Sequence, residues 1–267
     1  MSDFIRYEQQ GRVVTLTMSR PEERNAIGSH ADCEALVDAV ERAAADPEVA
    51  VLVLTGAGSA FSAGGNLKGM RDRDGIGPLA SPLATRGNYR RGVQRIPLAL
   101  WNCEVPTIAA INGHAIGVGL DLACMCDMRI AAQGVKLAAS FIKMGIVPGD
   151  GGAYVLPRAV GWSTAAEMMF TGEPIDSAQA LACGLVSRIV PGDALMDETR
   201  ALAQRIAANP PQTLRLVKRL LREAQHARLD EVLQLSAAFQ ALAHETADHR
   251  EALAAFADKR PARFTGK

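Results

Sequence analysis

The order of helices and buried strands in the first half of the chain most restricts the possible folds. Residues 50–54 (AVLVL) form a continuous apolar run, which is typical of a strand covered on both faces. Upstream, Ser29 and Asp32 form a helix-start pattern, and the apolar residues that follow recur at helical spacing until Asp46-Pro47. Because a helix that leads into a fully buried strand is the unit from which parallel sheets are built, we expect an α/β fold.

Further strands and one short helix continue this order. Two runs that flank Gln9-Gln10-Gly11 predict a hairpin at the start of the chain. The hairpin strands are expected at residues 4–7 and 12–18, later strands at residues 105–111, 128–132 and 185–190, and the short helix at residues 119–126. The strand-and-helix pattern therefore extends to residue 190.

The pattern becomes almost wholly helical after Pro191. Helices are predicted at residues 195–208, 213–227 and 229 to about 256. We therefore divide the chain into a core of residues 1–190 and a helical region of residues 191–267. Because apolar faces on such a region need a partner surface, we expect a homo-oligomer.

Two capping-box patterns lie just before this change. Thr164-x-x-Glu167 and Asp176-x-x-Gln179 each predict a helix start, and Gly184 is expected to end the second of these helices. Residues 71–97, by contrast, are rich in Gly, Pro and Arg and show no steady period. That segment is predicted to be either a lid or active-site loop, or a solvated insertion.

The charge balance limits the partners of this chain. It carries 29 Lys and Arg against 29 Asp and Glu, so its formal net charge is zero. Proteins that bind long polyanions carry an excess of positive charge. Aromatic residues make up only 4% of the chain, which also argues against a base-stacking surface. We expect no nucleic-acid partner.

The cysteines and the first residues indicate the compartment. The five cysteines are odd in number and lack framework spacing, which favours reduced thiols. Cys124 and Cys126 have no second cysteine pair nearby, so no metal site is expected. The first residues carry charge without an apolar segment, and no stretch of about 20 apolar residues occurs. We expect a cytoplasmic protein with no membrane partner.

Two glycine-rich turns each follow a predicted strand and precede a predicted helix. Residues 55–70 (TGAGSAFSAGGNLKGM), with a helix start expected near Leu67, and residues 111–122 (INGHAIGVGLDL) lack the spacing of dinucleotide-binding and Walker motifs. Two such turns could each aim a backbone N–H group at one point, as an oxyanion hole requires. The alternative is that the glycines only pack.

Several sequence motifs resemble those of the enoyl-CoA hydratase/isomerase (crotonase) family. The resemblance covers nearly the whole chain, is least evident over residues 71–97, and rests on RPEERNAI (20–27), FSAGGNLK (61–68), INGHAIGVGLDLACMCDMRIAA (111–132), GIVPGDGG (145–152), FTGEPIDSAQALACGLVSRIV (170–190) and FADKRPARFTGK (256–267). It implies a ββα spiral core, a helical C-terminal trimerisation region, and a homotrimer or a dimer of trimers. It implies no cofactor beyond the coenzyme A of the substrate thioester.

The resemblance also implies the binding residues. The thioester oxygen would accept hydrogen bonds from the backbone N–H groups of Gly65 and Val118, the latter replacing a usual glycine. The last two of the remaining residues would reach the acyl-CoA from the tail, within the chain or across a subunit boundary. The residues that would line the acyl-CoA are Arg24, Asn25, Ala26, Ala63, Asn66, Leu67, Lys68, Phe141, Phe256 and Lys259.

The acid–base residues depart from the family pattern. Hydratases of the family use two Glu residues, and this chain has Asp121 and Phe141 at those positions. Phe141 removes an ionisable group, so the two-carboxylate mechanism does not transfer directly. Asp150 is a second candidate. The alternatives are that Asp121 is a helix-start carboxylate and that Asp150 caps the helix that follows it.

The resemblance predicts an enzyme that stabilises a thioester enolate for double-bond hydration or isomerisation. Asp121 and Asp150 acting together would favour isomerisation, whereas a water held by Asp150 would permit hydration. Two alternatives stay open: an acyl-CoA-binding protein with little or no catalysis, and a hydrolase of carbon–carbon bonds in 3-oxo compounds.

Overall fold

A computed structural model describes residues 3–267 and contains two sheets. The larger sheet has six strands in the order β1-β2-β3-β5-β7-β10, in which β1 is antiparallel to β2 and the other pairs are parallel. Its strands are β1 (Ile5–Gln10), β2 (Val13–Met18), β3 (Val51–Gly56), β5 (Thr107–Ile111), β7 (Met128–Ala132) and β10 (Arg188–Val190). The predicted α/β class is confirmed.

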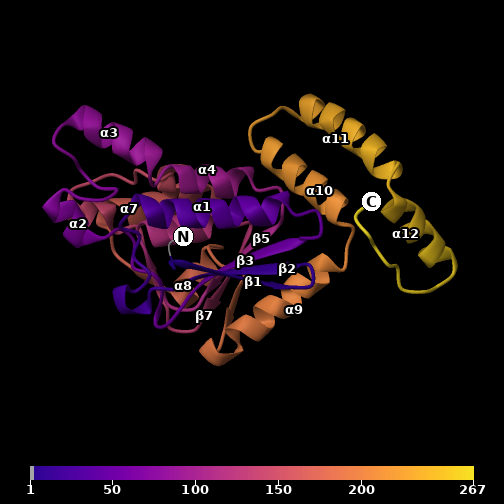
Figure 1. Cartoon of the computed structure of the whole chain (residues 1–267), viewed down its shortest axis with the longest axis horizontal. Helices are drawn as coiled ribbons and strands as arrows, with labels where there is room; N and C mark the ends of the chain where they lie inside the picture. The colour runs from indigo at the N-terminus through magenta and orange to yellow at the C-terminus, as the bar shows by residue number, and fades with distance from the viewer. Residues whose placement is uncertain (1–2) are drawn as a thin grey trace.

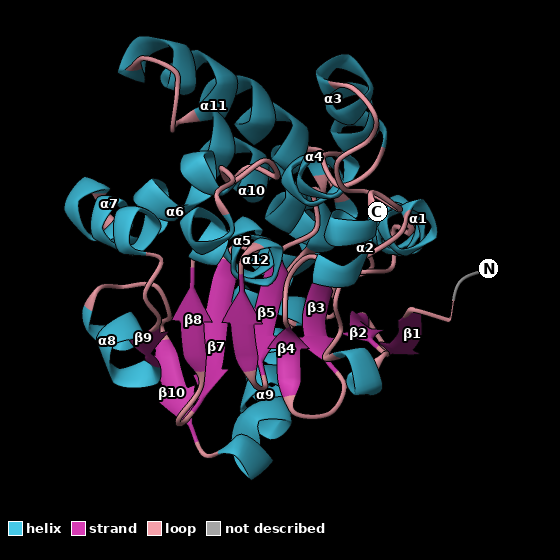
Figure 2. Ribbon diagram, turned by 90° about the vertical axis from the view of Figure 1, so that its left-hand side faces the viewer, coloured by secondary structure: helices cyan, strands magenta, loops and turns pink. Residues whose placement is uncertain are grey.

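A second sheet of four short strands lies beside the first (Figure 2). Its order is β4-β6-β8-β9, with bounds β4 (Ala60–Ser62), β6 (His114–Ile116), β8 (Lys136–Ala138) and β9 (Ile175–Asp176). The strands β4, β6 and β8 each follow a strand of the larger sheet after a short turn. The chain thus repeats a strand–strand–helix unit, which is the predicted ββα spiral. Sequence patterns miss these strands because runs of two or three residues carry no clear period.

Helices cover the sheets and form most of the second half of the chain (Figures 1 and 2). They are α1 (His30–Ala45), α2 (Leu67–Asp72), α3 (Pro82–Arg91), α4 (Arg95–Asn102), α5 (Val118–Met125), α6 (Gly152–Val160), α7 (Trp162–Thr171), α8 (Ser177–Ala182), α9 (Leu195–Ala207), α10 (Pro211–Glu223), α11 (Leu229–His244) and α12 (Ala247–Ala257). The helix α8 begins with the predicted capping box at Asp176, and the predicted helix start at Ser29 is also a capping box, which begins α1.

The segment of residues 71–97 is not a plain loop. It contains the end of α2, all of α3 and the start of α4. Ser81 caps α3 by accepting a hydrogen bond from the Ala84 N–H group, and Pro82 stands at its first position. Only Asn88 of this helix is buried. Because polar residues occupy almost every face, the helix has no apolar period by which the sequence could reveal it.

Other predicted boundaries also need correction. Thr164 does not cap a helix, because α7 begins at Trp162 after Gly161. The predicted helix of residues 229–256 is two helices, since Thr246 caps α12 by accepting from His249 N–H. The helix α10 spans residues 211–223 rather than 213–227, and β10 covers only residues 188–190 of the predicted 185–190. The hairpin strand β1 extends to Gln10, where it pairs with Val13.

The two ends of the helical region differ in how they pack. The helix α9 lies under the larger sheet and buries Leu195, Thr199 and Ala203. The helices α10, α11 and α12 instead project from the core (Figure 1). No residue of α11 is buried. The division at residue 190 stays a prediction.

Candidate active site

The two glycine turns pack directly against each other. A Cβ atom on Gly64 would lie 2.6 Å from the Ile116 carbonyl oxygen, and one on Gly119 would lie 2.5 Å from that of Ser62. Gly64 also has a φ of +94°, which side chains disfavour. The glycines do pack, as one of the two alternatives predicts, and this packing brings the two turns side by side.

Hydrogen bonds orient Gly65 in the first turn. Ile27 N–H donates to the Gly64 carbonyl at 2.9 Å, and Asn66 N–H donates to the Ile27 carbonyl at 3.1 Å. Gly65 lies between these two bonds in a parallel bridge with Ile27. The Gly65 N–H group therefore points away from Ile27, since alternate residues of a strand direct their backbone groups to opposite sides.

Val118 is the first residue of α5, one position earlier than the predicted helix start. The first N–H groups of a helix have no partner within it. Gly117, with a φ of +55°, leads into the helix, and its N–H donates to the Ala138 carbonyl at 2.8 Å. The turn is thus held from β8, and the Val118 N–H belongs to the first turn of α5, where it has no partner within the helix.

Asp121 and Asp150 are brought together in the interior. Asp121 is 0% exposed and Asp150 is 3% exposed. A Cβ atom on Gly152 would lie 2.1 Å from Oδ2 of Asp121, so the Asp121 carboxyl group rests on the first residue of α6. None of the four carboxyl oxygens has a well-formed hydrogen bond to another group of residues 3–267. The two carboxyl groups interact mainly with each other.

The pKa of both carboxyl groups is raised. Burial raises the pKa of Asp121 well above its usual range, and the charge of the neighbouring Asp150 raises it further. Burial also raises the pKa of Asp150, while its interaction with Asp121 opposes that rise. Two adjacent buried carboxylates repel each other strongly, so the pair retains one proton more readily than separate aspartates do.

The structure excludes the alternative role of Asp150 as a helix cap, and it places Asp121 at a helix start. Asp150 is not a helix cap, because Gly151 occupies the cap position of α6 and no side chain caps that end. Asp121 does lie in the first turn of α5, as a helix-start carboxylate would. Its carboxyl group, however, lies against α6.

Phe141 adds an apolar wall near the glycine turn. It lies on a 3-10 helix, η2 (Ser140–Met144). Its ring would be 3.7 Å from a Cβ atom on Gly117. An apolar ring therefore stands beside the turn that leads to Val118.

The predicted CoA-binding residues of the first half of the chain surround the first glycine turn. Asn25 is fully buried with a φ of +56°, and its side chain donates to the carbonyls of Ala57, Ala60 and Phe61. Its side chain is thus committed to holding the turn. The Ala63 N–H donates to the Arg24 carbonyl at 2.9 Å.

The next residues form the start of α2 and the nearby surface. Asn66 caps α2 by accepting from Gly69 N–H at 3.1 Å. Ala26 is half-buried, whereas Arg24, Leu67 and Lys68 are exposed and accessible to a ligand.

The helix α12 lies on the opposite side of the molecule from α2 (Figure 1). Phe256 is in α12, and Lys259 follows two residues after its end. Phe256 is 87% exposed and Lys259 is also exposed. These residues therefore do not line the site of their own chain.

Sequence patterns missed two residues that support the Asp150 turn. A Cβ atom on Gly149 would lie 2.7 Å from the Tyr89 ring, and the Gln94 side-chain amide donates to the Gly149 carbonyl at 2.7 Å. Asn88, beside Tyr89, donates to the carbonyls of Gly75 and Gly77. These contacts lie in the segment without a period, so no pattern could indicate them.

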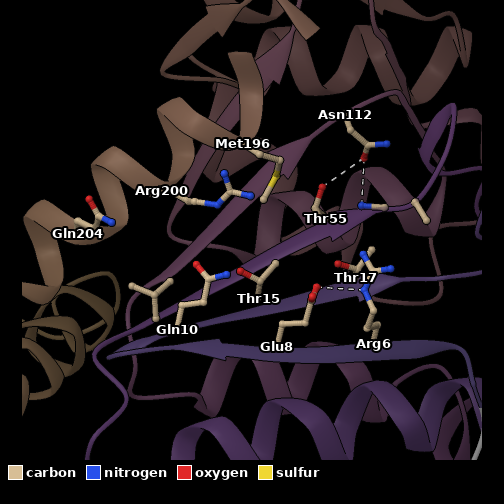
Figure 3. A pocket seen from close by; sticks show the side chains of 13 residues that line it. Arg6, Glu8, Gln10, Thr15, Thr17, Thr55, Asn112, Met196, Arg200 and Gln204 are labelled. Atoms are coloured by element: carbon tan, nitrogen blue, oxygen red, sulfur yellow. Dashed lines mark hydrogen bonds and ion pairs between the residues drawn. The ribbon is translucent and has the colours of Figure 1, made fainter. Parts of the chain in front are cut away.

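A polar pocket of about 270 Å³ lies between the β1–β2 hairpin and α9 (Figure 3). Neither Asp121 nor Asp150 lines it. Asn112, on its wall, accepts a hydrogen bond from Gly56 N–H at 3.0 Å and donates to the Gly58 carbonyl at 3.0 Å. This side of the pocket therefore holds the turns after β3 and β5 together.

Comparisons with known proteins agree with this geometry. The profile described as enoyl-CoA hydratase/isomerase matches residues 8–267. The chain belongs to the enoyl-CoA hydratase/isomerase family.

The relatives include both kinds of enzyme. The chain is 36% identical to the 2,3-dehydroadipyl-CoA hydratase and 35% identical to the 1,2-epoxyphenylacetyl-CoA isomerase of Escherichia coli K12, with all of each chain covered. It is similar to a solved enoyl-CoA hydratase from Bacillus anthracis, with a TM-score of 0.92 and 30% identity over 99% of this chain and 100% of that one. The predicted crotonase-like fold and acyl-CoA enzyme class are confirmed.

Two further findings concern residues 3–267. None of their helices has the length and apolar character needed to cross a membrane. Within the same residues, no group of three or more His, Cys, Asp or Glu side chains is arranged to hold a metal ion.

Proposed function

We propose that this enzyme moves the double bond of an enoyl-CoA thioester, with Asp121 and Asp150 as the proton-transferring pair. The observation that carries the proposal is the buried carboxyl pair, whose raised pKa values favour one shared proton. A group that isomerises an alkene must accept a proton at one carbon and return it at another. A carboxyl pair with one proton can do both.

The reaction begins with the thioester oxygen between the N–H groups of Gly65 and Val118. The ionised carboxyl removes a proton from C2 of a 3-enoyl thioester, and the negative charge moves to the oxygen, where both N–H groups stabilise it. The pair then returns a proton to C4, which gives the 2-enoyl thioester. No atom is gained or lost, and no cofactor beyond the substrate's own coenzyme A takes part.

Phe141 favours isomerisation over hydration. A hydratase needs one group to activate water and another to handle the proton at C2. The apolar ring at residue 141 cannot activate water, and it lies close to the glycine turn. Isomerisation requires no bound water and is served by the carboxyl pair alone.

Hydration is the second candidate, and the unsatisfied oxygens of Asp150 favour it. Neither oxygen has a hydrogen bond from the described residues, so both could accept from a water molecule over C3. Asp121 would then handle the proton at C2. The hydratases among the relatives support this candidate at the level of the family.

The test compares two substrates under identical conditions. Purified protein is given trans-3-hexenoyl-CoA or trans-2-hexenoyl-CoA, and the products are separated by chromatography. We expect 3-hexenoyl-CoA to become 2-hexenoyl-CoA without build-up of 3-hydroxyhexanoyl-CoA. Rapid hydration of 2-hexenoyl-CoA would favour the second candidate. Turnover of neither substrate, with CoA-ester binding retained, would favour a non-catalytic binding protein. A separate assay with 3-oxohexanoyl-CoA tests the hydrolase alternative, which cleavage of that thioester would favour.

We also propose a homotrimer or a dimer of trimers. The support is the set of exposed apolar side chains on the projecting helices, which include Leu233, Leu242, Leu253 and Phe256. In such an assembly, Phe256 and Lys259 of one chain could line the site of a neighbour. Arg24 and Lys68 would meet the CoA phosphates from the chain that holds the site. We further propose a cytoplasmic location and no nucleic-acid or membrane partner, in keeping with the zero net charge.

A further inference from the structure

A cavity of about 370 Å³ lies next to Asp150, between α4 and α6. Its volume is in the range of small-molecule sites. The cavity is lined by Gln94, Pro97, Leu98, Trp101, Met125, Gly149, Asp150, Gly151, Tyr154 and Val155. One of the two proposed proton-transferring groups therefore stands at its edge.

The side chains around this cavity are mostly apolar or aromatic. Trp101 and Tyr154 meet edge to face, with ring centroids 5.3 Å apart. The amide of Gln94 is already engaged with the Gly149 carbonyl. Asp150 is thus the only ionisable carboxyl group in the lining, and the remaining wall suits an apolar occupant.

Contacts within the chain hold the two aromatic rings in place. The guanidinium group of Arg222 lies 4.7 Å from the Trp101 ring centroid, and that of Arg158 lies 3.6 Å from the Tyr154 ring centroid. Tyr154 also hydrogen-bonds to His226. Fixed rings mean that the cavity is formed before any ligand binds, which lowers the entropic cost of binding.

Glycine at residue 151 keeps the space near Asp150 open. Gly151 has a φ of +105°, and a Cβ atom there would lie 3.2 Å from the Met125 methyl group and 3.7 Å from Pro97. A side chain at residue 151 would therefore narrow the passage between Asp150 and the aromatic rings.

The cavity does not end at Trp101. Trp101, Met125 and Val155 also line a second cavity of about 540 Å³ that extends beneath α10. An elongated apolar group that enters beside Asp150 would have room to continue along this path.

We propose that this cavity binds the part of the acyl group beyond C4, and that the substrates are thioesters of apolar acyl chains of six or more carbons or of aryl-substituted chains. The inference rests on the proposed function, because it takes Asp150 as the group that faces the reacting carbons. It makes Trp101, Leu98 and Val155 residues that determine specificity. Short substrates would leave the cavity empty and bind more weakly.

The two tryptophans of the chain allow a direct binding test. Trp101 lines the cavity, whereas Trp162 on α7 is 79% exposed and lies outside it. In the Trp162→Phe variant, fluorescence comes from Trp101 alone. The variant is titrated with acetyl-, butanoyl-, hexanoyl-, octanoyl- and 3-phenylpropanoyl-CoA, which are saturated next to the thioester and cannot be isomerised.

We expect the Kd to fall about threefold to fourfold for each methylene from butanoyl- to octanoyl-CoA. We also expect Trp101 emission to change with octanoyl- and 3-phenylpropanoyl-CoA but not with acetyl-CoA. Equal affinity for butanoyl- and octanoyl-CoA would overturn the proposal. So would octanoyl-CoA binding that leaves Trp101 emission unchanged, because the chain would then lie elsewhere and a partner subunit could fill the cavity.

Two substitutions locate the chain within the cavity. Leu98 is 60% exposed, so Leu98→Ala should fold, and we expect it to weaken octanoyl-CoA binding severalfold without changing acetyl-CoA binding. Val155→Phe should fill the space and weaken octanoyl-CoA binding at least tenfold, and its thermal unfolding checks that it folds. The Trp162→Phe variant is the control, and calorimetry should give it the same Kd for each ester as the unmodified protein. If both cavity variants bind octanoyl-CoA as tightly as the control, the assignment is wrong.

The test separates this proposal from the proposed reaction. A chain-length dependence without isomerisation of 3-hexenoyl-CoA would support the cavity assignment and contradict the reaction. Isomerisation with equal affinity for all saturated esters would do the reverse.

Discussion

Two regions of the molecule differ in which side chains they bury. One surrounds Asp121 and Asp150, and the other is formed by the projecting helices α10–α12. In the first region, two carboxyl groups are buried almost completely, with apolar and backbone atoms around them. In the second, Leu229, Leu233, Leu242, Leu253 and Phe256 are at least 57% exposed. A buried charge is costly unless it is paired or hydrogen-bonded, and an exposed apolar face is costly unless another surface covers it. We therefore assign the proposed chemistry to the first region and the proposed contact with another chain to the second.

The strongest test of this contrast is to neutralise the buried pair. Asp121→Asn keeps the shape of the side chain but removes its ability to accept a proton. We expect the rate of 3-hexenoyl-CoA isomerisation to fall about 10³-fold, within the range for loss of a general acid–base group, with no change in oligomeric state. Steady-state kinetics and light scattering measure the two quantities. A variant with full activity would show that the pair is not the proton-transferring group.

Asp150→Asn should also reduce the rate by about 10²-fold to 10³-fold. If each aspartate acted alone, the double variant would lose the product of the two effects. Because we place both in one pair, we expect the double variant to be little slower than Asp121→Asn. Multiplicative losses would indicate two independent groups.

Lys218 holds the junction between the core and the projecting helices. Lys218 on α10 is 5% exposed, and its ammonium group bonds to Asp127 and to the Val105 carbonyl, each at 2.7 Å. Removing it leaves Asp127 with Arg222 as its remaining cation. We expect Lys218→Ala to lower the free energy of unfolding by about 2–3 kcal/mol, measured by urea denaturation.

Arg219 on the same helix supplies the matched control. It pairs with Glu223 on the surface, where both side chains are more than 40% exposed. Arg219→Ala should change the free energy of unfolding by about 0.5 kcal/mol or less. Equal effects of the two substitutions would show that the Lys218–Asp127 ion pair does not hold α10 to the core.

The pH dependence of stability sharpens the description of the carboxyl pair. An aspartate whose pKa is higher in the folded than in the unfolded protein binds its proton more tightly when folded. Its contribution to stability is therefore complete below the unfolded pKa of about 3.9 and is lost as the pH rises through the folded pKa. Asp121→Asn should remove this loss. The melting temperature of the variant minus that of the unmodified protein should therefore increase from pH 4.5 to pH 8. A difference that stays constant over this range would contradict the raised pKa of Asp121.

The smallest expected effect on the chemistry comes from the projecting helices. Leu242→Ser with Leu253→Ser should weaken assembly while leaving the secondary structure unchanged, as measured by light scattering across a concentration series and by circular dichroism. Ala254→Ser, an exposed change on α12, is the control. Unchanged assembly of the double variant would show that this face is not an interface.

The sequence predicts well those elements whose residues carry a period. The buried run at residues 50–54 and the capping boxes at Ser29 and Asp176 led to elements that the structure contains. The polar helix α3 was not predictable, because burial of Asn88 alone leaves no apolar face. The break at Thr246 was also missed, since the apolar pattern continues across it.

The site could be predicted only in part. The family motifs identified Asp121, Asp150 and the glycine turns, but no spacing shows that residues so far apart in sequence share one buried space. That proximity depends on Gly152, which leaves room for the Asp121 carboxyl group. The support of the Asp150 turn by Tyr89 and Gln94 depends on a segment whose fold the sequence did not reveal.

In the proposed reaction one buried carboxyl pair carries a proton from C2 to C4, and an isotope experiment can follow that proton. The protein is given 3-hexenoyl-CoA labelled with deuterium at C2, in ordinary water, and the 2-hexenoyl-CoA formed is examined by mass spectrometry for deuterium at C4. Because the pair is shielded from solvent, we predict that a measurable fraction of the product carries deuterium at C4. Two results together would contradict the proposed reaction. The unmodified protein would give product with no deuterium at C4 even at the earliest times, and the Asp121→Asn variant would form product at an undiminished rate.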